Sequence, residues 1–157
     1  MRKVQAVVVT YNRKALLKEC IDAILQQTTP VNKLIVVDNN STDGTKEFLQ
    51  EHNYLNNPVI EYMKLSENIG GAGGFYEGMN RARKYTPDWV WIMDDDTIPT
   101  ETCLEELLKA SEQIEGKVSF LASSVRGIHG EAMNVPKIAR NQFSEYTDWY
   151  KYLDKGM

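Results

Sequence analysis

Short apolar runs that alternate with helical patterns are the feature that most constrains how this chain can fold. The first run, residues 4–9, is nearly all apolar and β-branched, which is typical of a strand buried on both faces. Comparable runs recur at 34–37, 59–63, 89–93 and 118–122. The segments between them predict helices at 16–25, around 48–52, at 75–84 and at 102–114. This alternation predicts a Rossmann-like α/β fold, with a mostly parallel sheet and helices on both faces.

Length and composition fit a single globular core. The chain has 157 residues, of which 42% are hydrophobic and 25% charged, the usual range for a soluble domain. The net charge is −4 and the basic residues are scattered, so we expect no nucleic-acid partner. The apolar runs are far shorter than the roughly 20 residues of a membrane-spanning helix. Two cysteines, both in predicted helices, favour a reduced, cytoplasmic compartment.

The alternation of strands and helices stops after about Ser124. We therefore assign residues 1–125 to the core and residues 126–157 to an irregular C-terminal segment, which is polar with interspersed aromatic residues. No further strand is predicted there to complete the architecture, so the fold looks truncated.

Four unusual loops follow the predicted strands. Ligands of open parallel sheets bind at the carboxyl ends of the strands, so we expect these loops to share one edge of the sheet. The loops are Thr10-Tyr11-Asn12-Arg13, Asp38 to Gly44, Asn68 to Gly74, and Asp94-Asp95-Asp96. Asp38 is placed to accept a hydrogen bond from a nucleotide base and Tyr11 to stack on that base. An Asx turn at Asp38 and a rim aromatic at Tyr11 are the structural alternatives.

Three consecutive carboxylates, Asp94, Asp95 and Asp96, form the sharpest chemical signal. Like charges at the end of a buried strand repel one another and need a counter-charge. In an extended backbone Asp94 and Asp96 project to one side and Asp95 to the other, which suits two oxygen ligands on one Mg²⁺ or Mn²⁺ ion. The alternative is a structural turn in which the aspartates cap the following segment.

Four glycines occupy five positions in the third loop, from Gly70 to Gly74. Such a loop brings backbone N–H groups close to an anion at a helix start, but it also suits a tight turn with close packing of helix on sheet. The dinucleotide fingerprint Gly-x-Gly-x-x-Gly is absent. Gly73 and Gly78 have P-loop spacing, yet Met79-Asn80 replaces the Lys-Ser/Thr of that motif, which argues against a Walker-type NTPase.

Taken in order, these motifs resemble those of the family 2 glycosyltransferases, which have the GT-A fold. The matching motifs read Val-Val-Thr-Tyr-Asn-Arg, Val-Val-Asp-Asn-Asn-Ser-Thr-Asp-Gly-Thr, Glu-Asn-Ile-Gly-Gly-Ala-Gly-Gly and Trp-Ile-Met-Asp-Asp-Asp. The resemblance covers about residues 4–125 and looks most like the galactofuranosyltransferase and rhamnosyltransferase branches. It implies inverting transfer of a galactofuranose- or rhamnose-type sugar from a UDP- or dTDP-sugar to a hydroxyl of a growing cell-surface glycan.

The resemblance also implies roles for the loop residues. Thr10, Tyr11 and Asp38 would contact the uracil or thymine base. Asn68 would lie near the sugar or the phosphates, and Arg13 would assist the diphosphate. Asp94 and Asp96 would bind the cofactor, Mn²⁺ or Mg²⁺. The full set of substrate-binding candidates is Thr10, Tyr11, Asn12, Arg13, Asp38, Asn40, Asn68, Gly70, Gly71, Asp94 and Asp95.

The general base of the family pattern is missing. Such enzymes deprotonate the acceptor hydroxyl with an acidic pair that follows the metal motif, whereas Glu105-Glu106 is best interpreted as the solvated side of a helix. We therefore expect the base beyond Met157, and residues 126–157 to begin an incomplete acceptor region. This chain is then predicted to bind nucleotide with little or no sugar transfer. The full enzyme is expected in the cytoplasm or at the inner face of the plasma membrane.

Two other functions fit part of the pattern. A sugar nucleotidyltransferase also binds a metal and a nucleotide, but its glycine-rich loop should follow the first strand. That position here reads Thr10-Tyr11-Asn12-Arg13-Lys14, without glycine. A non-catalytic nucleotide-binding module would have the same sequence pattern, and only activity measurements separate it from an enzyme.

Overall fold

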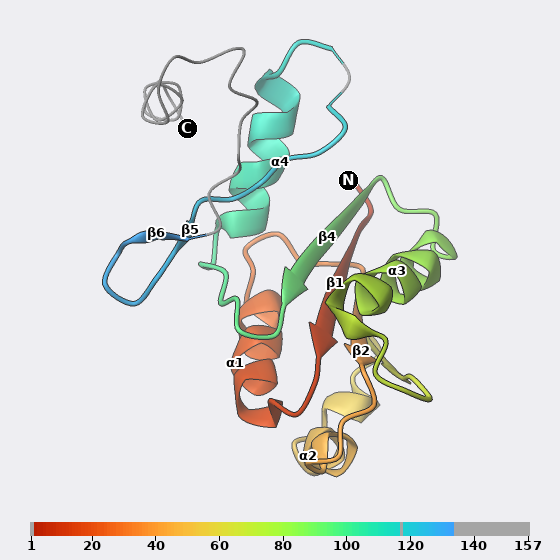
Figure 1. Ribbon diagram of the computed structural model, residues 1–157. Coiled ribbons are helices and arrows are strands. Elements are labelled where there is room, and N and C mark those ends of the chain that lie inside the picture. Colours follow the sequence, from red (N-terminus) through yellow and green to blue (C-terminus); the bar gives the residue numbers. More distant parts are fainter. Residues whose placement is uncertain (1, 117, 134–157) are drawn as a thin grey trace. The chain divides into compact units, whose positions relative to one another are not determined.

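A four-stranded parallel sheet forms the centre of the fold. The computed structural model describes residues 2–116 and 118–133. The strands are β1 (Val4–Thr10), β2 (Lys33–Asp38), β3 (Ile60–Lys64) and β4 (Trp89–Asp94), paired in the order β3-β2-β1-β4 (Figure 1). Every pair in this sheet is parallel. The predicted parallel α/β architecture is confirmed.

β1 lies inside the sheet, and all seven of its residues are buried. Its partners β2 and β4 pair with both of its edges, and burial of both of its faces explains why its sequence is nearly all apolar, with Gln5 and Thr10 as the exceptions. The register pairs Thr10 with Asp38 and Val9 with Asp94. The carboxyl ends of three strands are therefore level at one edge of the sheet.

Helices α1 (Lys14–Leu25) and α3 (Gly70–Arg83) pack on this sheet. The other helices are α2 (Thr45–Glu51) and α4 (Cys103–Gln113), with a 3-10 turn, η1, at Tyr54–Asn56. Figure 1 shows α1 and α3 on opposite sides of the sheet. The core on the α3 side contains Val7, Val9, Ile35, Val37 and Ala82. The buried face of α1 consists of Leu17, Cys20, Ile21 and Ile24, the helical spacing that the sequence predicted.

Two predicted elements differ from the structure. The glycine cluster was expected in a loop before a helix at 75–84, but α3 already begins at Gly70. Residues 118–122 were expected to form a fifth strand, yet they form none, and Phe120 is 82% exposed. An apolar run of five residues carries no periodicity that distinguishes a strand from an irregular segment. The next strands are only two residues long, β5 (Val125–Arg126) and β6 (Ala132–Met133), and they pair antiparallel with each other.

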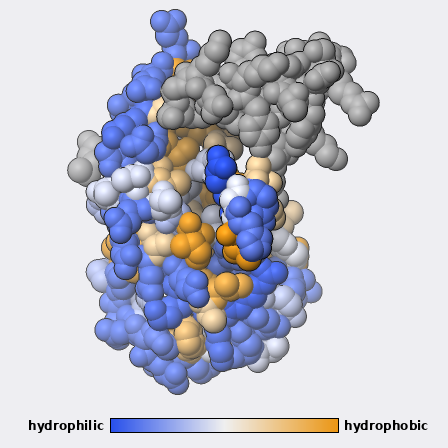
Figure 2. All heavy atoms as spheres, turned by 90° about the vertical axis from the view of Figure 1, so that its left-hand side faces the viewer, coloured by the Kyte–Doolittle hydropathy of each residue, from blue (hydrophilic) through white to orange (hydrophobic). Residues whose placement is uncertain are grey.

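The chain divides into two compact units, Met1–Glu105 and Glu106–Met157. The sheet β1 to β4 belongs to the first unit and the β5-β6 pair to the second. Among the helices of the described residues, none has the length and hydrophobicity to span a membrane. The surface seen in Figure 2 is mainly hydrophilic, with a few apolar side chains among the polar ones. Scattered exposure of this kind is ordinary for a globular protein.

Candidate functional site

The strand order reverses between β1 and β4. The chain runs outward from β1 through β2 to β3 and then returns to the other side of β1 as β4. In open α/β sheets the crevice outside the carboxyl ends at such a reversal is where ligands bind. Here the loop 10–13 follows β1 and the acidic triplet 94–96 ends β4, so both flank the reversal.

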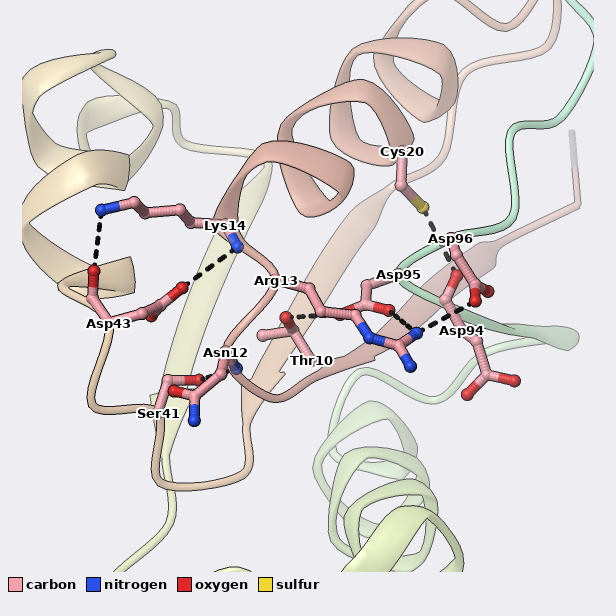
Figure 3. Close-up of polar contacts among 10 residues, drawn as sticks. All are labelled: Thr10, Asn12, Arg13, Lys14, Cys20, Ser41, Asp43, Asp94, Asp95 and Asp96. Carbon is pink, nitrogen blue, oxygen red and sulfur yellow. Dashed lines mark hydrogen bonds and ion pairs between the residues drawn. The ribbon is translucent and has the colours of Figure 1, made fainter.

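The middle aspartate of the triplet faces into the fold. The carboxylate of Asp95 is buried, and its Oδ2 accepts a hydrogen bond of 2.7 Å from Thr10 Oγ1. Its Oδ1 lies 3.4 Å from Nη1 of Arg13, and the same nitrogen donates to Asp96 Oδ2 at 3.0 Å (Figure 3). Two predicted substrate-binding residues, Thr10 and Asp95, thus bind each other and link β1 to β4.

Asp94 and Asp96 are both exposed, as a metal-binding role requires. Their carboxylates do not converge in this structure, because Figure 3 shows that of Asp94 pointing away from Arg13 and from its two neighbours. The expectation that both project to one side is therefore not met by these side-chain orientations. The described residues also contain no group of three or more His, Cys, Asp or Glu side chains arranged around one point. Asp94 and Asp96 are the two exposed carboxylates at this strand end.

The electrostatics of Asp94 favour a cation. Its side chain makes no hydrogen bond or ion pair within the described residues, unlike those of Asp95 and Asp96. Partial burial, followed by the charges of Asp96 and Asp95, raises the pKa of the Asp94 carboxyl above its ordinary value. The charge of Arg13 opposes this rise without forming an ion pair with Asp94. Two exposed carboxylates, Asp94 and Asp96, are a donor set of the hard oxygen type that Mg²⁺ and Mn²⁺ prefer. The residues present fit such an ion.

Cys20 lies beneath the triplet on α1. Its Sγ is 3.8 Å from the backbone oxygen of Asp94. Burial, with smaller contributions from the charges of the three aspartates, raises the pKa of the thiol to about 12. Cys20 therefore stays protonated and contributes packing rather than a thiolate ligand.

Asp38 is enclosed in the fold. Its side chain has no exposed surface, its Oδ1 accepts from the Ser41 N–H at 2.6 Å, and its Oδ2 accepts from the hydroxyl of Tyr62. Burial and then the hydrogen bond to Asp38 raise the pKa of Tyr62. In this conformation a nucleotide base would have to displace one of these donors to reach Asp38. The geometry shows a carboxylate that shapes its own loop, which is the alternative that the sequence left open.

Asn39 was not among the sequence candidates, although it connects three of the loops. Its backbone N–H donates to Thr10 O at 2.9 Å. Its side chain donates from Nδ2 to Gly70 O and accepts from Ile69 N at Oδ1, each at 3.0 Å. Asn39 is 3% exposed, whereas the candidate Asn40 is half-buried with φ of +65°. The only sequence signal for Asn39 was an amide residue between the apolar run 34–37 and a polar turn.

The first two loops are also joined to each other. Asn12 donates from its backbone to Ser41 Oγ at 2.9 Å, and its Oδ1 accepts from Thr42 N at 2.7 Å. Lys14 Nζ donates to Asp43 O at 2.7 Å. Burial alone would raise the pKa of the Asp43 carboxyl, but hydrogen bonds from Thr45 and from the Lys14 backbone outweigh burial and lower it. Asn12 is therefore held in the loop framework.

The third loop and the first residues of α3 present their candidates at the surface. Asn68, Gly70 and Gly71 are exposed, and Asn68 Oδ1 accepts from Gly70 N at 2.9 Å. Gly70 adopts φ of +76°, a conformation that favours glycine. Tyr11 is also 45% exposed, so its ring is open to a ligand. The structure thus brings Thr10, Arg13, Asp95 and Asp96 into contact and joins the other loops through Asn12 and Asn39.

Comparison with known proteins adds a family match. A family model described as "Glycosyl transferase family 2" matches residues 5–154. The galactofuranosyltransferase GlfT1 of Mycolicibacterium smegmatis is 40% identical over 98 residues, which are 62% of this chain and 31% of that protein. The putative teichuronic acid biosynthesis glycosyltransferase TuaG of Bacillus subtilis is 26% identical over 83% of this chain and 50% of its own length. The chain therefore spans about 31% and 50% of these two relatives.

Solved structures give the same picture. The mannosyltransferase PcManGT of Pyrobaculum calidifontis, in complex with GDP-Man and Mn²⁺, superposes with a TM-score of 0.59 at 28% identity and covers 70% of this chain and 32% of its own. TarS of S. aureus in complex with UDP-GlcNAc gives a TM-score of 0.56 at 25% identity, with coverage of 71% and 31%. The fold of both solved structures is similar to that of this chain.

Proposed function

The chain belongs to glycosyl transferase family 2, and from this membership we propose that it binds the sugar donor of an inverting glycosyltransferase. The donor is a UDP- or dTDP-linked sugar of the galactofuranose or rhamnose type, and the acceptor is a hydroxyl of a growing cell-surface glycan. One observation carries the proposal. The acidic triplet and Arg13 meet at the strand reversal between β1 and β4, where open α/β sheets bind their ligands.

The choice of donor is supported by the relatives. The 40% identity is to a galactofuranosyltransferase, and the similar solved structures contain GDP-Man or UDP-GlcNAc. Both ligands are nucleoside diphosphate sugars. We extend that donor class to residues 1–125 of this chain, with Tyr11 open to stack on the base and Asn68, Gly70 and Gly71 facing the sugar or phosphates.

A divalent cation, Mn²⁺ or Mg²⁺, would be held by Asp94 and Asp96. When bound, the ion offsets the charge that develops on the departing diphosphate, which is worth several kcal/mol in the transition state. Around it, Asp95 and Thr10 hold the end of β4 against β1. Asn39 fixes the start of α3 against β2. These contacts keep the ligand-binding loops in register.

Glu105 and Glu106 are not proposed as the acceptor base. Glu105 accepts from Thr28 Oγ1 at 2.7 Å, and Glu106 pairs with Lys109 at 3.2 Å, so both carboxylates take part in helix-surface contacts. The sequence prediction that residues 126–157 begin an acceptor region lies mostly outside the described residues. The proposal keeps donor binding with little or no sugar transfer for this chain, and the cytoplasm or the inner face of the plasma membrane for the full enzyme.

Calorimetric titration tests the proposal. UDP, dTDP and GDP are titrated into the protein with Mn²⁺ and with EDTA, and into the variants Asp96→Asn and Asp88→Asn. Asp88 is a matched control, because it accepts a hydrogen bond from Lys3 N at the opposite end of β4. We expect Mn²⁺-dependent binding of UDP or dTDP by the parent and Asp88→Asn, and its loss in Asp96→Asn. Binding that ignores both metal and variant would refute the metal assignment, and failure to bind any of the nucleotides would refute the donor-binding function.

A further inference from the structure

Arg13 has an unusual set of contacts. It precedes α1, and its guanidinium contacts two carboxylates of the triplet through one nitrogen, Nη1. Its Nε and Nη2 make no hydrogen bond within the described residues. Arginine is a planar fork of donors that binds carboxylate or phosphate oxygens in pairs. Half of this fork is therefore available to a further anion.

The two carboxylates that hold Arg13 differ in environment. The side chain of Asp95 is 4% exposed, and its other oxygen is fixed by Thr10. The Arg13–Asp96 pair is open to solvent on both sides, with exposed fractions of 52% and 51%. Ion pairs in that setting contribute little, because water and salt screen them. Asp95 is thus the carboxylate that the fold holds in place. The Asp96 contact is the shorter of the two, 3.0 Å against 3.4 Å, but it is the one exposed to solvent and to exchange.

We propose that Arg13 couples the metal and the diphosphate by exchanging partners, an inference that rests on the donor-binding function proposed above. Without ligand, Arg13 serves as the counter-ion of Asp96. With Asp96 engaged by a divalent cation, Arg13 would keep its contact with Asp95, and its Nε and Nη2 would be the donors to oxygens of the diphosphate. Arg13 would therefore compete with a free cation for Asp96 and would add hydrogen bonds to a bound nucleotide.

The proposal makes opposite predictions for the two ligands. Removing the positive charge in Arg13→Gln leaves Asp96 open, so Mn²⁺ alone binds about fivefold more tightly, the scale of one exposed ion pair. The same variant loses two donors to the diphosphate, so UDP at saturating Mn²⁺ binds at least about tenfold more weakly. Arg13→Lys keeps the charge but not the fork, so its Mn²⁺ affinity stays close to that of the parent while UDP affinity still falls.

The experiment measures free Mn²⁺ by electron paramagnetic resonance and UDP or dTDP binding by calorimetry, on folded protein checked by circular dichroism. Lys18→Gln is the charge-matched control, since Lys18 also lies on α1 and pairs with the exposed Asp22 at 2.6 Å. We expect both affinities to be unchanged in Lys18→Gln. If Arg13→Gln fails to fold, the UDP or dTDP affinity of Arg13→Lys tests whether Arg13 donates to the diphosphate.

Three results would overturn the coupling. They are an Arg13→Gln variant that behaves like Lys18→Gln, one that binds Mn²⁺ more weakly than the parent, and an Arg13→Lys variant with parental UDP affinity. Each of these presupposes that the parent binds UDP or dTDP in an Mn²⁺-dependent way. If the parent itself shows no such binding, the donor-binding function fails rather than the role of Arg13.

Discussion

Neighbouring residues of the acidic triplet lie in different environments. Asp95 is buried with both oxygens engaged, whereas Asp94 is exposed and has no partner within the described residues. In the structure only Asp94 belongs to β4, and the turn at Asp95 and Asp96 buries Asp95 while Asp94 and Asp96 stay exposed. The strand alternation expected from the sequence predicted that Asp95 differs from its neighbours. It did not predict that Thr10 and Arg13 are what satisfy Asp95, since those contacts connect residues more than 80 positions apart.

The hydroxyl of Thr10 is expected to matter for stability. Thr10→Val keeps the shape of the side chain but leaves an oxygen of the buried Asp95 without its donor. An unsatisfied buried acceptor costs about 1–3 kcal/mol, more if charged, so we expect the free energy of unfolding to fall by about that amount. Urea denaturation measures it. The control is Thr28→Val, which removes an exposed hydroxyl bonded to Glu105, and we expect it to lose under about 1 kcal/mol. Equal losses in both variants would contradict the role given to the Thr10–Asp95 bond.

At the scale of elements, α3 shows how a sequence pattern can be assigned to the wrong local structure, since the segment expected as a loop begins a helix. Four glycines in a row of five favoured a loop, because glycine weakens helices by about 1 kcal/mol each. The helix forms nonetheless because packing on the sheet outweighs that local preference. Gly74, Gly78 and Ala82 recur at four-residue steps and are all buried. The sequence analysis expected a loop up to Gly74 and did not identify this small-residue stripe, which follows from the close contact of α3 with the sheet.

The close packing of α3 on the sheet leaves no room for a side chain at Gly78. A Cβ at this position would collide with Cγ1 of Val7 and crowd Cγ2 of Val37. Alanine usually stabilises a helix relative to glycine, but here we expect Gly78→Ala to destabilise the protein by about 1–3 kcal/mol through overpacking. Gly71→Ala is the control, since its Cβ would meet nothing within 4 Å, and it should be neutral or stabilising by up to about 1 kcal/mol. Urea denaturation of both variants distinguishes them. A stabilising Gly78→Ala would show that α3 does not pack on β1 as described.

At the scale of the whole molecule, the parallel sheet was predictable and the second unit was not. Each strand from β1 to β4 is an apolar or β-branched run followed by a polar loop, and this combination recurs along the chain. Residues 118–122 have the apolar run but no strand, because a strand also requires a pairing partner, which a single run does not specify. The site was predictable to the extent that it follows from strand ends. The link made by Asn39 depends on tertiary contacts that only the folded chain reveals.

Ligand binding should protect the molecule in a pattern that follows this division. Hydrogen exchange with mass spectrometry compares the free protein with the protein saturated with Mn²⁺ and UDP or dTDP, whichever binds. A ligand that binds the native state slows local opening where it makes contact. We expect slower exchange in the loops 10–13, 68–74 and 94–97, and unchanged exchange in the β5-β6 pair at 125–133. EDTA should abolish the protection, because the cation joins the aspartates to the diphosphate. Protection of 125–133 without protection of 94–97 would mean that the donor does not bind at the strand reversal, and both proposals for this site would then be wrong.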